Sequence, residues 1–304
     1  MKPRSAFIIC LFILTVIIVY NNTINSIERF NNEKNKIAFI FLTVGDINKH
    51  AIWDKFFRSR DELYTIYVHP KFPEQVTSFF KEYIIHDLVW TKWGDVSLVE
   101  ATNNLISNAL KDKKNTKLIL VSDSCIPIKS FDEIYSTVMK DNLSWFNYYK
   151  PLDSVYDHRI HFRRINSLPD AIRNKSYIQE QWMILDRTHA ITINKNKDFL
   201  QYFRKERLIP DEMYYLTLLN ILYTNIKNEL RLPEHTRDEY LKHQYITCAN
   251  WFDIEQYNES HPKKYKQLVR KDLIYLLNSK ALFARKFDIE SDIDFYWDYI
   301  IHKT

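Results

Sequence analysis

Two short segments carry side chains suited to binding an anionic ligand. Residues 117–127 (KLILVSDSCIP) run from an apolar stretch directly into small polar residues, beginning with Ser122. Small polar groups at the carboxyl end of a strand are typical of ligand sites in open α/β sheets. Residues 282–288 (LFARKFD) place two adjacent cations, Arg285 and Lys286, inside a β-rich run. Cations are unfavourable in such a strand unless an anion neutralises them, so the two segments together predict an anion-binding site.

A third motif, WGDVSLVE at residues 93–100, predicts the start of a helix. Ser97 and Glu100 have the spacing of a capping box, so we interpret Glu100 as a cap rather than as a catalytic residue. Gly94 and Gly45 are the only two glycines of the chain, and both fall at predicted strand-to-helix turns. They indicate either a special backbone geometry or two ordinary turns.

The order of the apolar runs predicts how these segments are positioned. Strands alternate with helices in the first half, which predicts right-handed βαβ units and a Rossmann-like, mainly parallel α/β sheet flanked by helices. The pattern loosens in the second half, and no linker separates the two halves. The expected strands are 36–44, 63–69, 86–90, 117–122, 144–150, 178–186 and 282–287, and the expected helices are 51–60, 73–83, 97–111, 198–206, 210–223, 268–278 and 293–301.

The composition indicates a folded protein with a large core. The chain has 304 residues, of which 46% are hydrophobic and 15% aromatic, so it is neither disordered nor fibrous. The net charge of +5 comes from 43 basic and 38 acidic residues spread along the whole length. Such a mild excess suits an anionic small ligand or a membrane surface. No basic helix and no aromatic-basic motif appears, so we do not expect nucleic acid as a partner.

The N-terminus predicts attachment to a membrane. Lys2 and Arg4 precede an apolar run over residues 6–20, which is a little shorter than the ~20 residues that usually span a bilayer. No small-residue cleavage motif follows it. We expect residues 1–20 to form a cytoplasmic tip and a signal-anchor helix, 21–35 a polar stem, and 36–304 a lumenal domain. A cleaved signal peptide is the alternative, and it also places the domain in the secretory route.

Cysteines and acidic pairs give little sign of a metal site. Cys10 lies in the predicted anchor, which leaves Cys125 and Cys248 to form one disulfide or none, and these two are too few for a thiolate site. Residues 122–124 (Ser-Asp-Ser) are not a D-x-D motif. The chain's one D-x-D, at residues 292–294, begins a predicted helix, where acidic residues stabilise the helix dipole. We therefore expect that pair to be structural.

Seven segments, in this order, resemble one family: KIAFIFLT, LYTIYVH, WGDVSLVEAT, LILVSDSCIPIKSF, EQWMIL, PDEMYYLTLL and LFARKFD. Together they resemble the core-2/I-branching β-1,6-N-acetylglucosaminyltransferases, a family that also includes peptide-O-xylosyltransferases. The resemblance covers residues 36–294. It implies a GT-A-like fold and an inverting, metal-independent transfer of a sugar, N-acetylglucosamine, from a UDP donor to a glycan or glycoprotein. With the anchor, it implies a single-pass type II Golgi membrane protein that needs no cofactor.

The resemblance also implies roles for individual residues. Glu212, near the start of the predicted helix 210–223, corresponds to the base that takes the proton from the acceptor hydroxyl. Lys286 corresponds to a lysine that binds the diphosphate, and cations there would replace a divalent ion against the departing group. Because successive strand residues face opposite sides, we expect only one of the adjacent pair to face the site. The expected diphosphate-binding cations are Lys286, Arg285 and Arg270, with Lys271 and Lys264 as alternatives to the last.

Residues at the strand ends are implied to bind the nucleotide and the acceptor. Many relatives have an Asp after the second strand to contact uracil, whereas this chain has His69-Pro70-Lys71, which leaves the identity of the donor open. A xylosyltransferase-like activity, a non-catalytic lumenal carbohydrate-binding protein with this fold, and a soluble nucleotide-binding protein stay open as alternatives. The implied donor-binding residues are Thr43, His69, Trp93 and Ser122, and the implied acceptor-binding residues are Gln181 and Trp182.

Overall fold

The computed structural model describes residues 34–302, apart from 152–164, 166, 205–208, 237–238, 240–243 and 252–261. Residues Lys36–Thr304 form one compact unit. The anchor predicted over residues 1–20 and nearly all of the stem predicted over 21–35 lie outside the described residues. In the part of the chain that the structure does describe, no helix is both long enough and apolar enough to cross a membrane.

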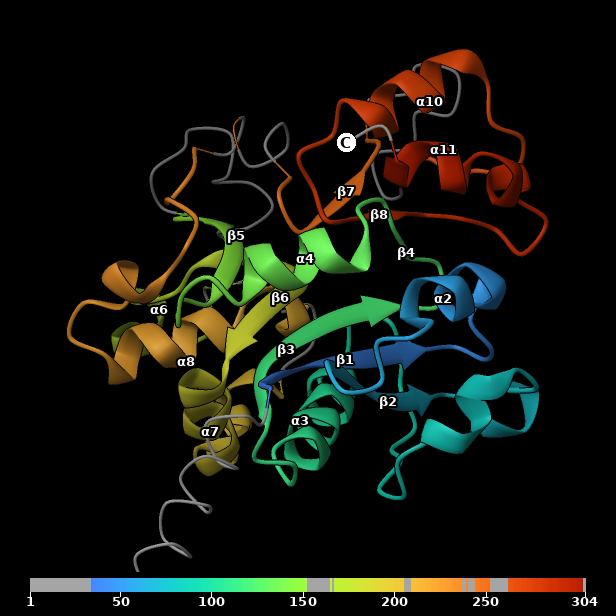
Figure 1. The fold of residues 1–304 in the computed structure, drawn as a ribbon. Coiled ribbons are helices and arrows are strands. Elements are labelled where there is room, and N and C mark those ends of the chain that lie inside the picture. Colours follow the sequence, from blue (N-terminus) through green and yellow to red (C-terminus); the bar gives the residue numbers. More distant parts are fainter. Residues whose placement is uncertain are drawn as a thin grey trace, which may run out of the picture. The chain divides into compact units, whose positions relative to one another are not determined.

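A five-stranded sheet forms the centre of this unit (Figure 1). Its strand order is β2-β1-β3-β6-β5, with β1 parallel to both β2 and β3, and β6 antiparallel to both β3 and β5. The prediction of a mainly parallel sheet is therefore correct only for the first half of the chain, because β6 inserts in the opposite direction between β3 and β5. The strands are β1 (Lys36–Thr43), β2 (Tyr64–Pro70), β3 (Asn115–Ser122), β5 (Trp145–Tyr149) and β6 (Ile178–Asp186).

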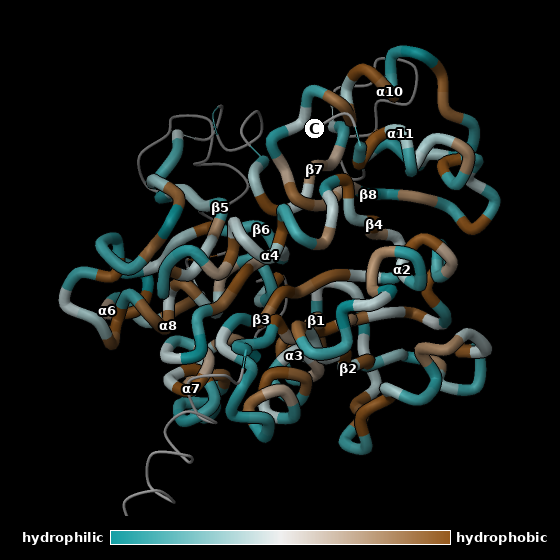
Figure 2. Tube along the Cα trace, viewed as in Figure 1, coloured by the Kyte–Doolittle hydropathy of each residue, from teal (hydrophilic) through white to brown (hydrophobic). Residues whose placement is uncertain are grey.

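Helices cover both faces of the sheet, and β1 shows why. Its side chains alternate between two hydrophobic clusters, with Phe39 in one and Ile40 in the other, so a continuous apolar run is buried on both sides. Figure 1 shows α3 on one face, and α2 and α4 on the other. Figure 2 shows mainly hydrophobic residues along β1 and β3. The flanking helices are α2 (His50–Phe57), α3 (Ser97–Ala109), α4 (Phe131–Val138), α6 (Asp170–Arg173), α7 (Arg187–Lys195) and α8 (Tyr214–Leu222).

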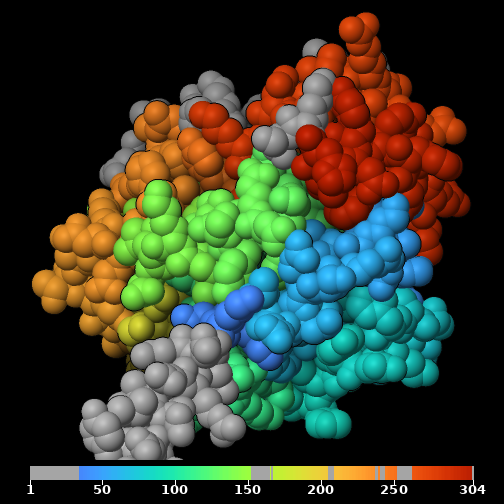
Figure 3. Space-filling view, viewed as in Figure 1, coloured from blue at the N-terminus to red at the C-terminus, as the bar shows by residue number. Residues whose placement is uncertain are grey.

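A second, three-stranded sheet has the order β4-β8-β7 and carries the cationic segment found in the sequence. The C-terminal residues around it pack against the segment that follows β1 (Figure 3). There Lys49 Nζ donates to Asp294 Oδ2 at 2.7 Å, and Asp292 Oδ1 accepts from Leu268 N at 2.9 Å. These contacts agree with a structural role for the D-x-D pair. The elements are β4 (Ile126–Pro127), β7 (Thr247–Ala249), β8 (Phe283–Arg285), α10 (Arg270–Leu277), η6 (Asp292–Phe295) and α11 (Trp297–His302).

The helix predicted for residues 73–83 is instead two 3-10 turns, η1 (Pro73–Gln75) and η2 (Phe79–Tyr83). Asp46 explains the break, since its carboxylate accepts hydrogen bonds from the backbone and hydroxyl groups of both Thr77 and Ser78. Burial by itself raises the pKa of Asp46, but these hydrogen bonds outweigh it and lower the pKa. The strand predicted at 86–90 is also absent, and the helix predicted at 198–206 is the 3-10 segment η3 (Lys197–Phe203).

The capping box predicted at the start of α3 is wrong. The side chain of Asp95, not that of Ser97, caps this end, because Asp95 Oδ1 accepts from Ser97 N at 2.9 Å. The hydrogen bonds with Ser97 lower the pKa of Asp95. Glu100 turns outward and pairs with Arg204 at 2.7 Å. Gly94 has a φ of 68°, a left-handed conformation that favours glycine, which supports the special-geometry interpretation at that position.

Candidate functional site

A cavity of about 490 Å³ lies where the carboxyl ends of the parallel strands meet β6, β7 and β8. Thr43 ends β1, Lys71 follows β2 and Ser122 ends β3, and all three line the cavity. The carboxyl ends of parallel strands are the usual ligand side of an open α/β sheet. Residues distant in the sequence meet here. Those predicted from the sequence that line the cavity are Thr43, Trp93, Ser122, Gln181, Trp182, Glu212, Arg285 and Lys286.

His69 and Arg270 do not line this cavity. His69 is fully buried, and its Nε2 accepts a hydrogen bond from Val89 N at 3.0 Å. Burial lowers the pKa of this imidazole, which is consistent with a neutral structural group. Arg270 is exposed at the first position of α10, whereas Lys264, named above as its alternative, does line the cavity. The positions of these two residues thus argue against nucleotide binding by His69 and diphosphate binding by Arg270.

The turn after β3 ties the strand ends together. Asp123 Oδ2 accepts from Val44 N at 3.0 Å, and its backbone oxygen accepts from Asn48 N at 3.0 Å. The Ser122 hydroxyl lies 3.2 Å from the Ser124 hydroxyl. The acidic residue at this position therefore joins the loops after β1 and β3, while the serine hydroxyls stay beside the cavity.

Three cations, Arg285, Lys286 and Lys264, converge on one side of the cavity. Burial lowers the pKa of Lys286, and the neighbouring charges of Arg285 and Lys264 lower it further. Lys264 forms an ion pair with Asp288. The expectation that only one of the adjacent cations faces the site is wrong, because β8 ends at Arg285 and the strand alternation stops there. Like charges held this close favour binding of a multivalent anion.

Arg285 is held by an aromatic ring. Its guanidinium carbon lies 4.6 Å from the ring centroid of Trp182, a cation–π distance, and Trp182 is only 5% exposed. The position of Trp182 therefore suits the support of Arg285 better than an open platform for a sugar face. The buried Nε of Arg285 has no hydrogen-bond partner among the described residues, which leaves a donor for a bound ligand.

Glu212 lies at the end of a 3-10 turn, η4 (Pro210–Glu212), rather than in the first turn of an α-helix as predicted. The turn follows Ile209, whose φ of 49° is left-handed, and α8 begins only at Tyr214. Gln179 anchors α8 to β6, since its Oε1 accepts from Leu216 N at 2.8 Å. A three-residue turn has little macrodipole, so the backbone contributes little positive charge beside Glu212.

Sequence reasoning missed Glu180, a second carboxyl group in the cavity. Burial raises the pKa of Glu180 to about 8, and the charge of Glu212 adds to this, although a hydrogen bond with Asn147 and the charge of Arg285 act in the opposite direction. The sequence did contain an indication of Glu180, because a charged residue is unusual in a mostly buried strand such as β6.

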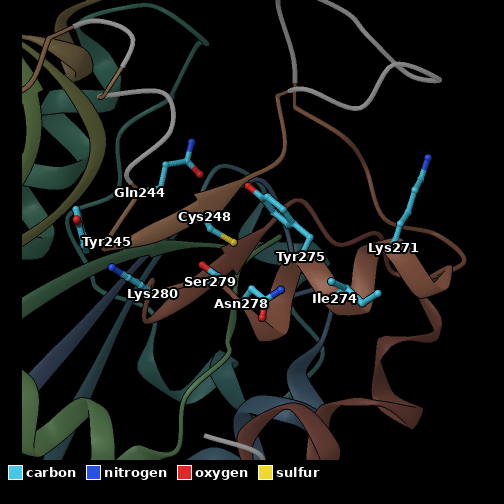
Figure 4. A pocket seen from close by; sticks show the side chains of 9 residues that line it. All are labelled: Gln244, Tyr245, Cys248, Lys271, Ile274, Tyr275, Asn278, Ser279 and Lys280. Atoms are coloured by element: carbon cyan, nitrogen blue, oxygen red, sulfur yellow. The ribbon is translucent and has the colours of Figure 1, made fainter.

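A second cavity, of about 540 Å³, lies between β7 and α10 (Figure 4). Thr247 and Ala249 face the first cavity and Cys248 faces this one, as strand alternation requires. Figure 4 shows the sulfur of Cys248 near Ser279, with Lys271 extending away. Burial raises the pKa of Cys248 to about 12, so its thiol is a poor nucleophile. Cys248 and Cys125 are both buried free thiols, which answers the disulfide question left open above.

The central sheet with helices on both faces, and the cavity lined by cations and carboxyl groups, define an α/β protein with a site suited to an anionic ligand. Residues 37–276 match the model of the core-2/I-branching enzymes, and the chain belongs to that family. The family predicted from the seven sequence segments is thereby confirmed, and the mixed α/β fold is compatible with a GT-A-like architecture.

A named relative supports the same family. Glycosyltransferase BC10 of Oryza sativa subsp. japonica is 26% identical over 270 residues, an alignment that covers 76% of this chain. The chain spans 62% of the length of that relative.

Proposed function

We propose that the chain is a glycosyltransferase that transfers a sugar, N-acetylglucosamine, from a UDP donor to a hydroxyl group of a glycan or glycoprotein, with inversion and without a divalent metal. The family and the name of the rice relative support the transferase class. The observation that carries the proposal is the placement of Arg285, Lys286 and Lys264 in the same cavity as Glu212. A glycosyl transfer from a nucleotide sugar needs both of these charges in one site.

The cations bind the diphosphate and stabilise it as it departs. When the bond between the anomeric carbon and the phosphate oxygen breaks, negative charge builds up on that oxygen. Trp182 holds Arg285 in place before the reaction, so this cation needs little reorganisation when the charge develops, and the half-buried Lys286 lies next to it in the chain. Thr43, Ser122 and the 74% exposed Trp93 lie at the nucleotide end of the cavity in this proposal.

Glu212 acts as the base. The acceptor hydroxyl attacks the anomeric carbon from the face opposite the diphosphate, and Glu212 takes its proton as the new carbon–oxygen bond forms. Attack on that face inverts the configuration of the sugar. Gln181, which lines the cavity from β6, belongs to the acceptor side in this proposal, whereas Trp182 acts on the donor side by holding Arg285.

The experiment is a UDP-release assay with residues 36–304, using UDP-N-acetylglucosamine, UDP-xylose, UDP-galactose and UDP-glucose in the presence of EDTA. We expect release with UDP-N-acetylglucosamine, and a loss of about 10²–10⁴-fold in Glu212→Gln. Glu100→Gln is the matched control, because Glu100 is outside the cavity in its ion pair with Arg204. Release that requires a divalent metal contradicts the cation mechanism, and binding of UDP-sugar without turnover indicates a non-catalytic protein.

We further propose that the predicted anchor places this domain in the Golgi lumen. The support is the sequence pattern of residues 1–20 alone. Asn142 and Asn174 are exposed and belong to N-x-S/T sites, so expression of the full chain in eukaryotic cells should attach glycans there. The sequence also has N-x-S/T at Asn21 and Asn258. A smaller mass shift on glycosidase treatment in each single variant to Gln than in the wild type would confirm that site, and an unglycosylated wild type would contradict the lumenal location.

A further inference from the structure

We propose that Glu180 binds the acceptor: its carboxyl group hydrogen-bonds a sugar hydroxyl next to the one that Glu212 deprotonates. The inference rests on the proposed function. It adds a second carboxyl group to the site, with a role different from that of the base.

The first argument is the hydrogen bonding of Glu180. This side chain lines the cavity, and its Oε2 is buried without a hydrogen-bond partner among the described residues. A hydrogen bond with the Asn147 side chain holds the carboxyl group on the other side. An unsatisfied buried polar atom is unfavourable, so such atoms are rare unless water or a ligand completes them. Arg285 Nε is a second such atom in the same cavity.

The second argument is the charge around Glu180. Glu212 faces it from η4 and Arg285 from β8, while Cys248 of β7 and Tyr275 of α10 approach from the other cavity. Only Arg285 among these favours the ionised form. With the pKa of Glu180 raised to about 8, the carboxyl group keeps its proton at neutral pH and can donate a hydrogen bond. Glu212 can then accept from one sugar hydroxyl while Glu180 donates to another.

The third argument is the position of Glu180 in the chain. It directly precedes Gln181 in β6, which is assigned to the acceptor. Glu212, the proposed base, also faces Glu180. A hydroxyl held by Glu180 therefore lies beside the attacking oxygen in this proposal.

The test compares Glu180→Gln and Glu180→Ala with the wild type, using p-nitrophenyl glycosides of galactose, N-acetylgalactosamine and xylose as acceptor probes. Gln keeps a neutral donor at this position, so we expect kcat/KM within about threefold of the wild type. Ala removes the donor, and we expect at least a tenfold rise in the acceptor KM, equivalent to about 1.4 kcal/mol, with the donor KM within twofold. Retention of the wild-type acceptor KM in Glu180→Ala overturns the inference.

The pH profile separates binding from a merely structural role. The wild-type kcat/KM should fall above about pH 8, where Glu180 loses its proton, and Glu180→Gln should shift that fall to higher pH. If kcat/KM falls at the same alkaline pH in the wild type and in Glu180→Gln, the inference is overturned. A wild type that releases UDP from none of the donors contradicts the proposed function itself, and the inference with it, whereas normal turnover with an unchanged acceptor KM in Glu180→Ala contradicts the inference alone.

Discussion

Replacing Glu180 by Gln should stabilise the protein at alkaline pH more than at acidic pH. Burial raises the pKa of Glu180 from its ordinary value of 4.5 to about 8 in the folded protein. Between these two pH values the unfolded chain releases the proton and the folded chain keeps it, so the free energy of unfolding falls as the pH rises. At 1.36 kcal/mol per pKa unit, the full cost is up to about 5 kcal/mol.

Only part of that cost develops in the accessible pH range. With a folded-state pKa of about 8, about 3 kcal/mol of it develops between pH 5.5 and 8.5. Gln has the same shape and does not ionise, and it removes this cost. The melting temperature of Glu180→Gln relative to the wild type should therefore increase by about 6–12 °C between pH 5.5 and 8.5.

Thermal melts of residues 36–304 at pH 5.5 and 8.5, followed by circular dichroism, measure this difference. Any effect of the substitution on packing is the same at both pH values, so it cancels when the two melting-temperature differences are compared. Glu74→Gln, an exposed position, is the matched control and should show no change with pH. If the melting temperatures of the wild type and Glu180→Gln differ by the same amount at both pH values, Glu180 is not protonated in the folded protein. This outcome does not depend on whether the protein is an enzyme.

Three further predictions follow from described contacts. Lys286→Ala should lower kcat by about 10²–10³-fold in the UDP-release assay, since it removes a half-buried cation beside the departing diphosphate, and an unchanged kcat would contradict that role. Lys117→Met should lower the free energy of unfolding in urea by about 3–5 kcal/mol, because it leaves Asp186, 3.4 Å from Lys117 Nζ, buried without its cation. Ser130→Ala should cost about 1 kcal/mol in the same assay, as the Ser130 hydroxyl caps α4 at Glu133 N, and a larger loss would indicate a role beyond capping.

The strands of the first half could be predicted because local pattern decides them. The runs at β1 and β3 are apolar and β-branched enough to be buried on both faces, whatever lies beside them, and β2 adds a β-rich run at the edge of the sheet. Residues 73–83 have a helical pattern, but the carboxylate of Asp46 holds Thr77 and Ser78 in another conformation. A contact between residues 31 positions apart overrides the local preference there.

The candidate site was predictable to the extent that single residues mark it. Arg285 and Lys286 stand out in an apolar strand, and Glu212 follows a proline at the start of a predicted helix. A role for Glu180 could not be assigned in the same way. Its environment depends on Asn147, Arg285 and Glu212, which belong to three different elements of the fold. His69 was misplaced since a histidine at a strand end looks the same in sequence whether it faces the ligand or the interior.

The cationic segment lies far from Thr43 in the sequence, and this has a consequence for biosynthesis. Phe283–Arg285 and Lys286 leave the ribosome long after Thr43, which lines the same cavity. The nascent chain therefore has its first parallel strands long before it has the cations of the cavity. A protein shortened before residue 283 would lose these cations and the strand that joins β4 to β7 in a single step.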